Sequence, residues 1–262
     1  MGCIIWFVRR VIDDWKFLKL KSIMNKIFTY LELLWHWRMA LIPSLYFNLR
    51  YLPFKQGVKM PILINKPHLH KMNGKIVIDA AKITPGMIKL GGFGGHMYPN
   101  SGIHITQWGG EIIFKGRCTI GNNSFLVQGA DSRIVFGDKF CASTSVKIVS
   151  FKEIEFGTYV RVGWDCVFMD TNFHPLYDME KDSFKRAYGP IKIGDYNWFA
   201  MQCKVMHSVE TPERCIFGMG SVVGRGCKFE SYCVHGGSPL RVLTRNVMRV
   251  VGKDFITNYN EY

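Results

Sequence analysis

The segment Asp170-Thr-Asn-Phe-His174-Pro175 carries the side chains best suited to acid–base chemistry in this sequence. Histidine titrates near neutral pH, so the imidazole of His174 can take a proton from a hydroxyl group and return it later in a reaction. Asp170 and Asn172 precede it closely and could orient its ring or bind the molecule that bears the hydroxyl. Both are also ordinary turn residues. The segment therefore makes His174 a candidate general base, and Asp170 and Asn172 candidates for orienting its ring or binding the acceptor, the molecule that bears the hydroxyl.

This segment interrupts a repeat of six residues in which an apolar residue is usually followed by glycine. The apolar-glycine pairs are Ile120-Gly121, Phe136-Gly137, Phe156-Gly157 and Val162-Gly163 before the interruption, and Ile193-Gly194, Phe217-Gly218 and Val223-Gly224 after it. A short strand and a tight turn every six residues build a solenoid whose first position points inward, with glycine expected to supply the turn dihedrals. The pattern predicts an all-β solenoid, and a histidine in a loop that leaves such a solenoid is better placed for function than an isolated loop histidine.

The stretch from Phe156 to Arg245 resembles the hexapeptide-repeat transferases, which include galactoside, maltose and xenobiotic acetyltransferases. The segment around His174 is similar to the family's Thr-x-x-His-Pro segment, and residues 188–194 are similar to its return to the coil. The resemblance implies a left-handed parallel β-helix, although the general rule for crossovers favours the opposite hand. It also implies that His174 is the general base in a one-step transfer of an acetyl or short acyl group from acyl-CoA to a hydroxyl. Residues 46–54 are similar to N-termini of acyltransferases from polysaccharide-synthesis clusters, which favours a saccharide acceptor.

The resemblance further implies a set of contacts to acetyl-CoA, the expected co-substrate, and a homotrimer with active sites between neighbouring subunits. The residues at the family's contact positions are Trp198, Met201, Met219, Gly224, Arg225 and Arg241. Arg225 stands where a lysine is usual, and its guanidinium could meet CoA phosphates. Packing between coils is an equally good interpretation of Met201 and Met219.

The residue composition and pattern divide the chain into three expected regions. Residues 1–70 form an amphipathic helical cap or a membrane-surface segment, residues 71–240 the β-helix catalytic domain with its loop 171–190, and residues 241–262 a helical-looking C-terminal tail. The net charge is +14, and residues 1–66 hold eleven basic residues against three acidic ones. Peripheral contact of residues 1–40 with an anionic membrane is therefore expected as an alternative to simple capping. Because no stretch of about 18 residues is free of charge, a spanning helix is not expected.

The eight cysteines are scattered, with no CxxC pair and no secretory signal before them, which favours core thiols in a reducing cytoplasm, with the inner face of the membrane as an open alternative. Only net charge favours nucleic acid, so it is not expected as a partner. No metal is expected either, because no acidic or cysteine cluster completes a site near His68 and His70.

Three other functions have less support in the sequence. An amino-acid hydroxyl acceptor, as in serine acetyltransferase, would require a helical domain that is not evident. A non-catalytic solenoid that docks on glycans or membranes would leave His174 dispensable. A metal-dependent carbonic anhydrase on the same solenoid needs three converging histidines, and no two of the eight histidines are five residues apart. The sequence names neither the acceptor nor the length of the acyl chain.

Overall fold

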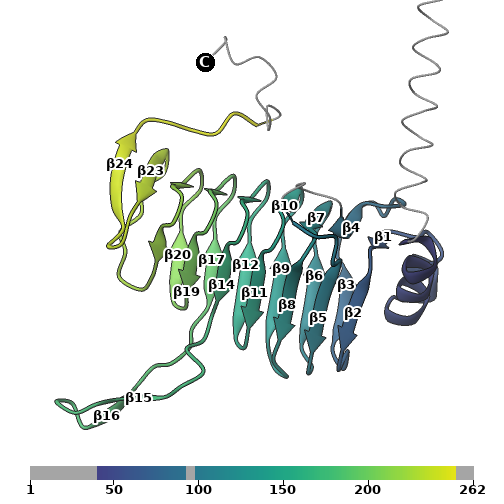
Figure 1. Ribbon diagram of the computed structural model, residues 1–262, viewed down its shortest axis with the longest axis horizontal. Helices are drawn as coiled ribbons and strands as arrows, with labels where there is room; N and C mark the ends of the chain where they lie inside the picture. The colour runs from purple at the N-terminus through teal and green to yellow at the C-terminus, as the bar shows by residue number, and fades with distance from the viewer. Residues whose placement is uncertain (1–39, 93–97, 252–262) are drawn as a thin grey trace, which may run out of the picture.

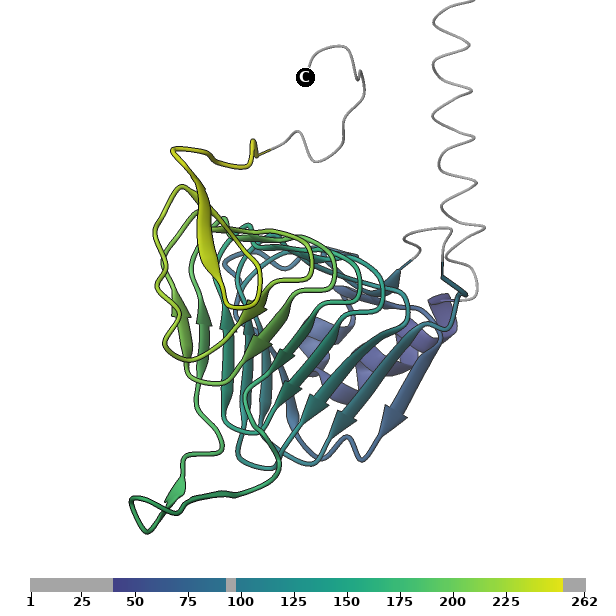
Figure 2. The same ribbon diagram turned by 60° about the vertical axis from the view of Figure 1, so that its left-hand side comes forward.

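The computed structural model describes residues 40–92 and 98–251, which wind into a left-handed parallel β-helix (Figure 1). Strands of successive coils stack into three long sheets that form the walls of the solenoid (Figure 2). The predicted fold class is therefore confirmed. Among the described residues, no helix combines the length and apolar character needed to cross a lipid bilayer.

The three sheets share one connection order, because each coil contributes a strand to every wall in turn. The nine-stranded sheet contains β1 (Ile62–Ile64), β4 (Ile88–Gly92), β7 (Cys118–Gly121), β10 (Phe140–Ala142), β13 (Arg161–Val162), β18 (Trp198–Phe199), β21 (Ile216–Phe217), β23 (Cys233–Gly236) and β24 (Arg241–Arg245). The seven-stranded sheet contains β2 (Pro67–His70), β5 (Ile103–Gln107), β8 (Ser124–Gln128), β11 (Lys147–Ser150), β14 (Val167–Met169), β19 (Lys204–Met206) and β22 (Val222–Val223). The six-stranded sheet contains β3 (Lys75–Ile78), β6 (Glu111–Phe114), β9 (Arg133–Phe136), β12 (Glu153–Phe156), β17 (Ile191–Ile193) and β20 (Val209–Thr211).

The six-residue repeat sets the length of the later coils. Trp198 pairs with Ile216 and Ile216 with Val234, so each of these coils takes 18 residues, three repeats of six. Arg161 pairs with Trp198, and that longer coil contains the loop 171–190. Inward positions repeat from coil to coil, which places the rings of Phe114, Phe136 and Phe156 in one stack with centroids 5.3 and 5.6 Å apart. Burial of each such ring stabilises the fold by about 1.5–3 kcal/mol.

The repeat glycines serve a different purpose from the one expected. Gly163 and Gly194 do not have a positive φ; the positive values fall two residues later, at Asp165 and Tyr196. A Cβ atom on Gly163 would lie 2.7 Å from the backbone nitrogen of Met201, and one on Gly194 would lie 2.6 Å from the carbonyl carbon of Pro212. Gly163 and Gly194 are thus required because the backbone of the next coil passes too close for a side chain, whereas Gly224, towards the C-terminal end of the solenoid, has no atom within 4 Å of its Cβ position.

A helical stretch over residues 40–51 covers the N-terminal end of the solenoid, followed by the short helix α2 (Phe54–Gly57) (Figure 1). Ser44 and Asn48 bind the free edge of β1: Ile64 N donates to Ser44 Oγ at 2.9 Å, and Ile62 N donates to Asn48 Oδ1 at 3.1 Å. Asn48 Nδ2 also donates to Ile62 O at 2.6 Å. Two side chains one helical turn apart therefore satisfy the edge strand in place of another coil.

Both ends of the predicted domain differ from the sequence-based boundaries. The first coil starts at Ile62, inside the range 1–70 assigned to the cap. The sequence pattern does not reveal this coil, because its strands are short and lack the apolar-glycine pair. At the other end, residues 241–245 form β24, antiparallel to β23, where a helical tail was expected. This antiparallel pair ends the nine-stranded sheet at the C-terminal end of the solenoid (Figure 1).

Candidate active site

The loop 171–190 leaves the β-helix after β14 and returns at β17, at the corner between the seven-stranded and six-stranded sheets. Main-chain hydrogen bonds close its base: Asn172 N donates to Ala187 O at 2.7 Å, and Gly189 N donates to Asp170 O at 3.0 Å. Beyond the base, β15 (Leu176–Asp178) and β16 (Ser183–Lys185) form an antiparallel hairpin that projects from the solenoid (Figure 2). The closed base fixes the start of the loop on the corner.

Asp170 holds the point where the chain leaves the coil. Its carboxylate is fully buried and accepts hydrogen bonds from Ser150 Oγ at 2.9 Å, Phe151 N at 2.7 Å and Lys152 N at 2.8 Å. Three donors compensate the cost of burying the charge and tie the loop base to the preceding coil. The acceptor-binding role assigned to Asp170 stays a prediction, and it would require one of these donors to be exchanged for the acceptor.

We expect Asp170→Ala to lower the free energy of unfolding by about 2–4 kcal/mol, because the buried hydroxyl of Ser150 and two part-buried backbone N–H donors lose a charged acceptor. Asp170→Asn keeps one carbonyl oxygen and should lose less. Thermal and denaturant unfolding measure both, with Asp131→Ala, an exposed aspartate, as the matched control. A loss below about 1 kcal/mol for Asp170→Ala would show that the loop base is held by its main chain alone.

His174 projects from a backbone fixed by its predecessor. Phe173 has a φ of 60°, its backbone nitrogen donates to Thr171 Oγ1 at 3.1 Å, and its ring packs edge-on against Phe151 with centroids 5.0 Å apart. The His174 side chain is exposed, and its imidazole forms no hydrogen bond with any residue that the structure describes. Asn172 lies half-buried at the loop base. Within one chain, His174 is thus positioned by the backbone, with no described side chain to orient its ring.

The structure adds His207 and Arg186 to the corner, and neither is among the predicted site residues. His207 follows β19 at the same corner one coil on, and its Nδ1 lies 3.0 Å from Ser208 Oγ. Burial lowers the pKa of His207, and the charges of Arg225 and Arg186 lower it further, against an opposing effect of Asp170. The imidazole is therefore biased towards its neutral form. The sequence signal was available, since His207 occupies a turn of a coil in which the apolar-glycine pair is missing.

The residues predicted to bind acetyl-CoA divide between the two corners of the solenoid at which the strands of the seven-stranded sheet begin and end, and we call these corners the two edges of that sheet. Gly224 and Arg225 follow β22 on the same corner as the loop, and Arg225 is exposed. Met201 and Met219 lie in adjacent turns at the opposite edge, where Gly220 N donates to Met201 O at 3.0 Å. Crossing the sheet takes about five residues at about 3.3 Å each, so the two edges are roughly 15 Å apart. One chain therefore does not bring His174 together with Met201 and Met219.

Trp198 and Arg241 lie in the nine-stranded sheet. Trp198 is exposed on β18, between Arg161 and Ile216 of the neighbouring strands. Arg241 is exposed at the start of β24, paired with Gly236. Trp198 thus belongs to the side of Met201 and Met219, whereas Arg241 sits in the terminal hairpin.

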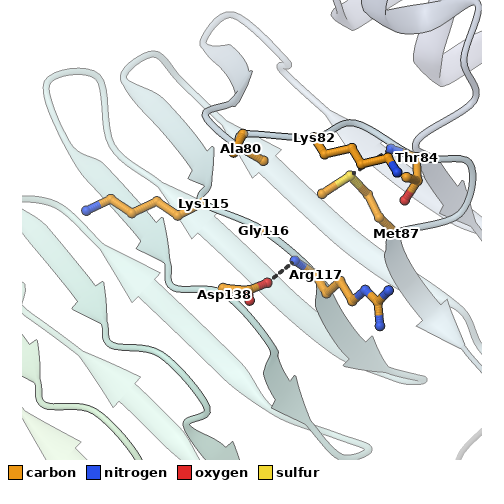
Figure 3. Close-up of a pocket in the computed structure, with 9 residues that line it drawn as sticks. Ala80, Lys82, Thr84, Met87, Lys115, Gly116, Arg117 and Asp138 are labelled. Carbon is orange, nitrogen blue, oxygen red and sulfur yellow. Dashed lines mark hydrogen bonds between the residues drawn. The ribbon is translucent and has the colours of Figure 1, made fainter.

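A separate hollow of about 280 Å³ lies where the six-stranded sheet turns into the nine-stranded sheet, in the first coils (Figure 3). Lys82, Lys115 and Arg117 contribute to its walls, together with Asp138, which accepts a hydrogen bond from the backbone nitrogen of Arg117 at 2.7 Å. Lys115 pairs with Glu155 at 3.3 Å. The hollow contains none of the predicted site residues. No cluster of three or more histidine, cysteine, aspartate or glutamate side chains that could hold a metal ion occurs among residues 40–92 and 98–251.

Comparison with known proteins supports the fold. No protein-family model and no curated protein matches the sequence. Among solved structures, the polySia specific acetyltransferase NeuO matches with a TM-score of 0.53 at 15% identity, over 74% of this chain and 81% of that one. The polysialic acid O-acetyltransferase OatWY matches with a TM-score of 0.39 at 17% identity (76% and 91% covered), and a maltose O-acetyltransferase from Clostridium difficile with 0.31 at 14% (83% and 90% covered). The predicted resemblance to hexapeptide-repeat transferases is confirmed at the level of the fold.

Proposed function

We propose that this protein transfers an acetyl group, or a similarly short acyl group, from acyl-CoA to a hydroxyl group of a saccharide or polysaccharide precursor, with His174 as the general base. The observation that carries the proposal is the position of His174, on a backbone fixed by Thr171 and Phe151, in the loop that interrupts the β-helix. The fold shared with NeuO, a polysialic acid acetyltransferase by its name, supports the reaction class and a saccharide acceptor.

In this mechanism acyl-CoA supplies a thioester carbonyl and a thiolate leaving group. The neutral imidazole of His174 removes the proton from the acceptor hydroxyl as its oxygen forms the new C–O bond to the carbonyl carbon. The C–S bond then breaks, and the imidazolium returns the proton to the departing sulfur. The transfer is direct, so no residue of the chain carries the acyl group.

The donor would be held by the predicted set Trp198, Met201, Met219, Gly224, Arg225 and Arg241. Gly224 offers open backbone, because no atom lies within 4 Å of the position a Cβ would take. The exposed guanidinium of Arg225 suits a phosphate of CoA. Asp170 and Asn172 stay candidates for the acceptor side, Asn172 being the more available because the carboxylate of Asp170 already has three donors.

We further propose a homotrimer in which neighbouring subunits share each site, and two surfaces of the described chain support it. One of the two columns of outward positions on the seven-stranded sheet holds Thr106 followed by four apolar residues in register, Val127, Val149, Met169 and Met206, while the other column includes Lys147 and Lys204. The six-stranded sheet instead presents ion pairs such as Arg133 with Glu153 at 3.5 Å. The projecting loop also exposes large apolar side chains, including Met179 at 90% and Phe184 at 73%. Exposed apolar surface of this extent is typical of an interface.

The test is to incubate purified protein with a panel of acyl-CoAs and hydroxyl acceptors and to measure free thiol released. The expected result is thiol release that depends on a saccharide acceptor and is fastest with acetyl-CoA or another short-chain donor. Serine in the panel tests the amino-acid alternative, because release with serine and no saccharide would move the acceptor to that class. No release with any pair, from a folded protein, would favour the non-catalytic solenoid.

A further inference from the structure

The helical stretch 40–51 and α2 expose an apolar surface on the side that faces away from the solenoid. Ala40, Ser44, Phe47 and Asn48 are buried against the first coil. The other side should be polar if water covered it. It instead exposes Leu41 (46%), Ile42 (80%), Leu45 (50%), Tyr46 (57%), Leu49 (44%), Phe54 (74%) and Val58 (52%), and we call these seven residues the end surface.

The charged side chains of residues 40–78, the segment that carries the end surface, all have a positive sign. Exposed Arg50, Lys55 and Lys59 lie among or next to its apolar residues. Lys66 and Lys71 follow in the first coil, as does Lys75, which pairs with Glu111 of the next coil at 3.9 Å. The sequence contains no aspartate or glutamate from residue 33 to residue 78. A set of exposed apolar side chains on a segment whose charges are all positive is complementary to an apolar layer bordered by anions. That is the structure of a bilayer with anionic headgroups.

We propose that the end surface docks the protein on an anionic lipid membrane. Aromatic and aliphatic side chains such as Tyr46, Phe54 and Ile42 would enter the boundary between headgroups and acyl chains, while Arg50, Lys55 and Lys59 meet lipid phosphates. The inner side of the same helix closes the β-helix through Ser44 and Asn48. One element therefore has two roles, an end cap on its inner side and a membrane anchor on its outer side. The proposal does not depend on the proposed enzymatic function.

Charge distinguishes the membrane from the other candidate occupants. A second copy packed on the same surface would bring Arg50, Lys55 and Lys59 against their own like charges. Residues 1–39 lie outside the described residues, as does nearly all of the segment 1–40 expected to contact lipid, and they carry seven basic residues against three acidic ones. That segment therefore does not supply the missing negative charge, whereas an anionic lipid surface does.

Docking would set the orientation of the solenoid and the height of the site. The helix lies at one end of the coil stack, and the loop with β15 and β16 leaves the solenoid several coils away (Figure 1). From β2 to β14 the seven-stranded sheet advances by four strands. At about 4.8 Å per strand, the base of the loop stands roughly 20 Å from the first coil. The docked protein would thus hold its candidate active site above the lipid headgroups.

The test measures binding of the full-length protein to two kinds of vesicle by co-sedimentation, phosphatidylcholine alone and phosphatidylcholine with phosphatidylglycerol. We expect salt-sensitive binding to the anionic vesicles. The double substitution Ile42→Glu with Phe54→Glu should weaken it by at least about tenfold, because two exposed apolar side chains that enter the bilayer are replaced by anions. Lys55→Glu with Lys59→Glu should weaken it by about fivefold or more per lysine, since charge attracts each cation to the headgroups. The matched control is Leu243→Glu, an exposed apolar residue at the other end of the solenoid, which should bind as the unmodified protein does.

Each outcome decides the proposal. Unchanged melting temperatures would show that the variants fold, as expected for exposed positions. Binding that persists in the Ile42→Glu, Phe54→Glu protein would assign lipid contact to residues 1–39 and overturn the proposal. Absence of vesicle binding by the unmodified protein would overturn it too. If Ile42→Glu with Phe54→Glu instead changes the oligomeric state measured by sedimentation velocity, the end surface is a contact between copies and the proposal is overturned as well.

Discussion

Replacing His174 by alanine is expected to lower kcat for acyl transfer by two or more orders of magnitude. Loss of a positioned general base typically costs a factor of about 100 to 10,000, because the acceptor hydroxyl must then lose its proton to water. The melting temperature should be nearly unchanged, since the His174 side chain is exposed and makes no described hydrogen bond. Steady-state kinetics with acetyl-CoA and the best acceptor of the panel, together with thermal unfolding, measure both quantities.

The matched control is His70→Ala, which removes another exposed histidine in β2, four strands along the seven-stranded sheet from the loop. It should retain full activity. Added imidazole should restore part of the activity of His174→Ala, a rescue that a purely structural role would not show. Near-normal transfer by a folded His174→Ala protein would exclude His174 as the base.

The regular part of the fold was readable from the sequence because its coils obey a strict period. From Val162 onwards, apart from the loop, an inward residue recurs every six residues and is apolar except at Thr211 and His235. The backbones approach so closely that glycine is needed at Gly163 and Gly194. The first coils are less regular: Ile88 pairs with Cys118, a coil of 30 residues whose long turns hide the period. The strands β1 and β2 were missed for this reason, and β24 because its pairing with β23 is antiparallel and outside the repeat.

The candidate site was only partly predictable, for a geometric reason. The interruption of the repeat is visible in sequence, so the loop and His174 could be identified. The roles of Asp170 and His207 depend on contacts between coils, namely the donors at residues 150–152 and the arginines at 186 and 225. Sequence spacing gives no register between coils of unequal length. It also gave no sign that the predicted CoA contacts lie on two edges of one sheet.

That division leads to the prediction that the protein is a homotrimer whose active sites are completed across subunit interfaces. His174 lies at one edge of the seven-stranded sheet, and Met219, 67% exposed, lies at the other. If a neighbouring subunit places its Met219 edge beside the loop, the two meet in a slot that neither chain forms alone. Sedimentation equilibrium should then give three times the mass of one chain.

Mixed trimers measure the sharing directly. His174→Ala removes the base, and Met219→Trp fills the slot, so each variant alone should be nearly inactive. When the two are co-expressed in equal amounts, a site is intact if its base comes from a Met219→Trp subunit and its slot from a His174→Ala subunit. Random assembly in a closed ring makes this true for about one quarter of the sites. We expect about a quarter of the unmodified activity, whereas sites contained within single subunits would give none.

The control for this experiment places both substitutions in the same chain. Co-expressed in equal amounts with unmodified protein, the double variant leaves a shared site intact only when both contributing subunits are unmodified, again about one quarter of sites. Sites within single chains would instead keep about half of the activity. The two mixtures therefore distinguish the two arrangements. Shared sites would give about a quarter of the unmodified activity in both mixtures, whereas sites within single chains would give none in the first mixture and about half in the second. A fully active monomer at micromolar concentration would refute the shared site altogether.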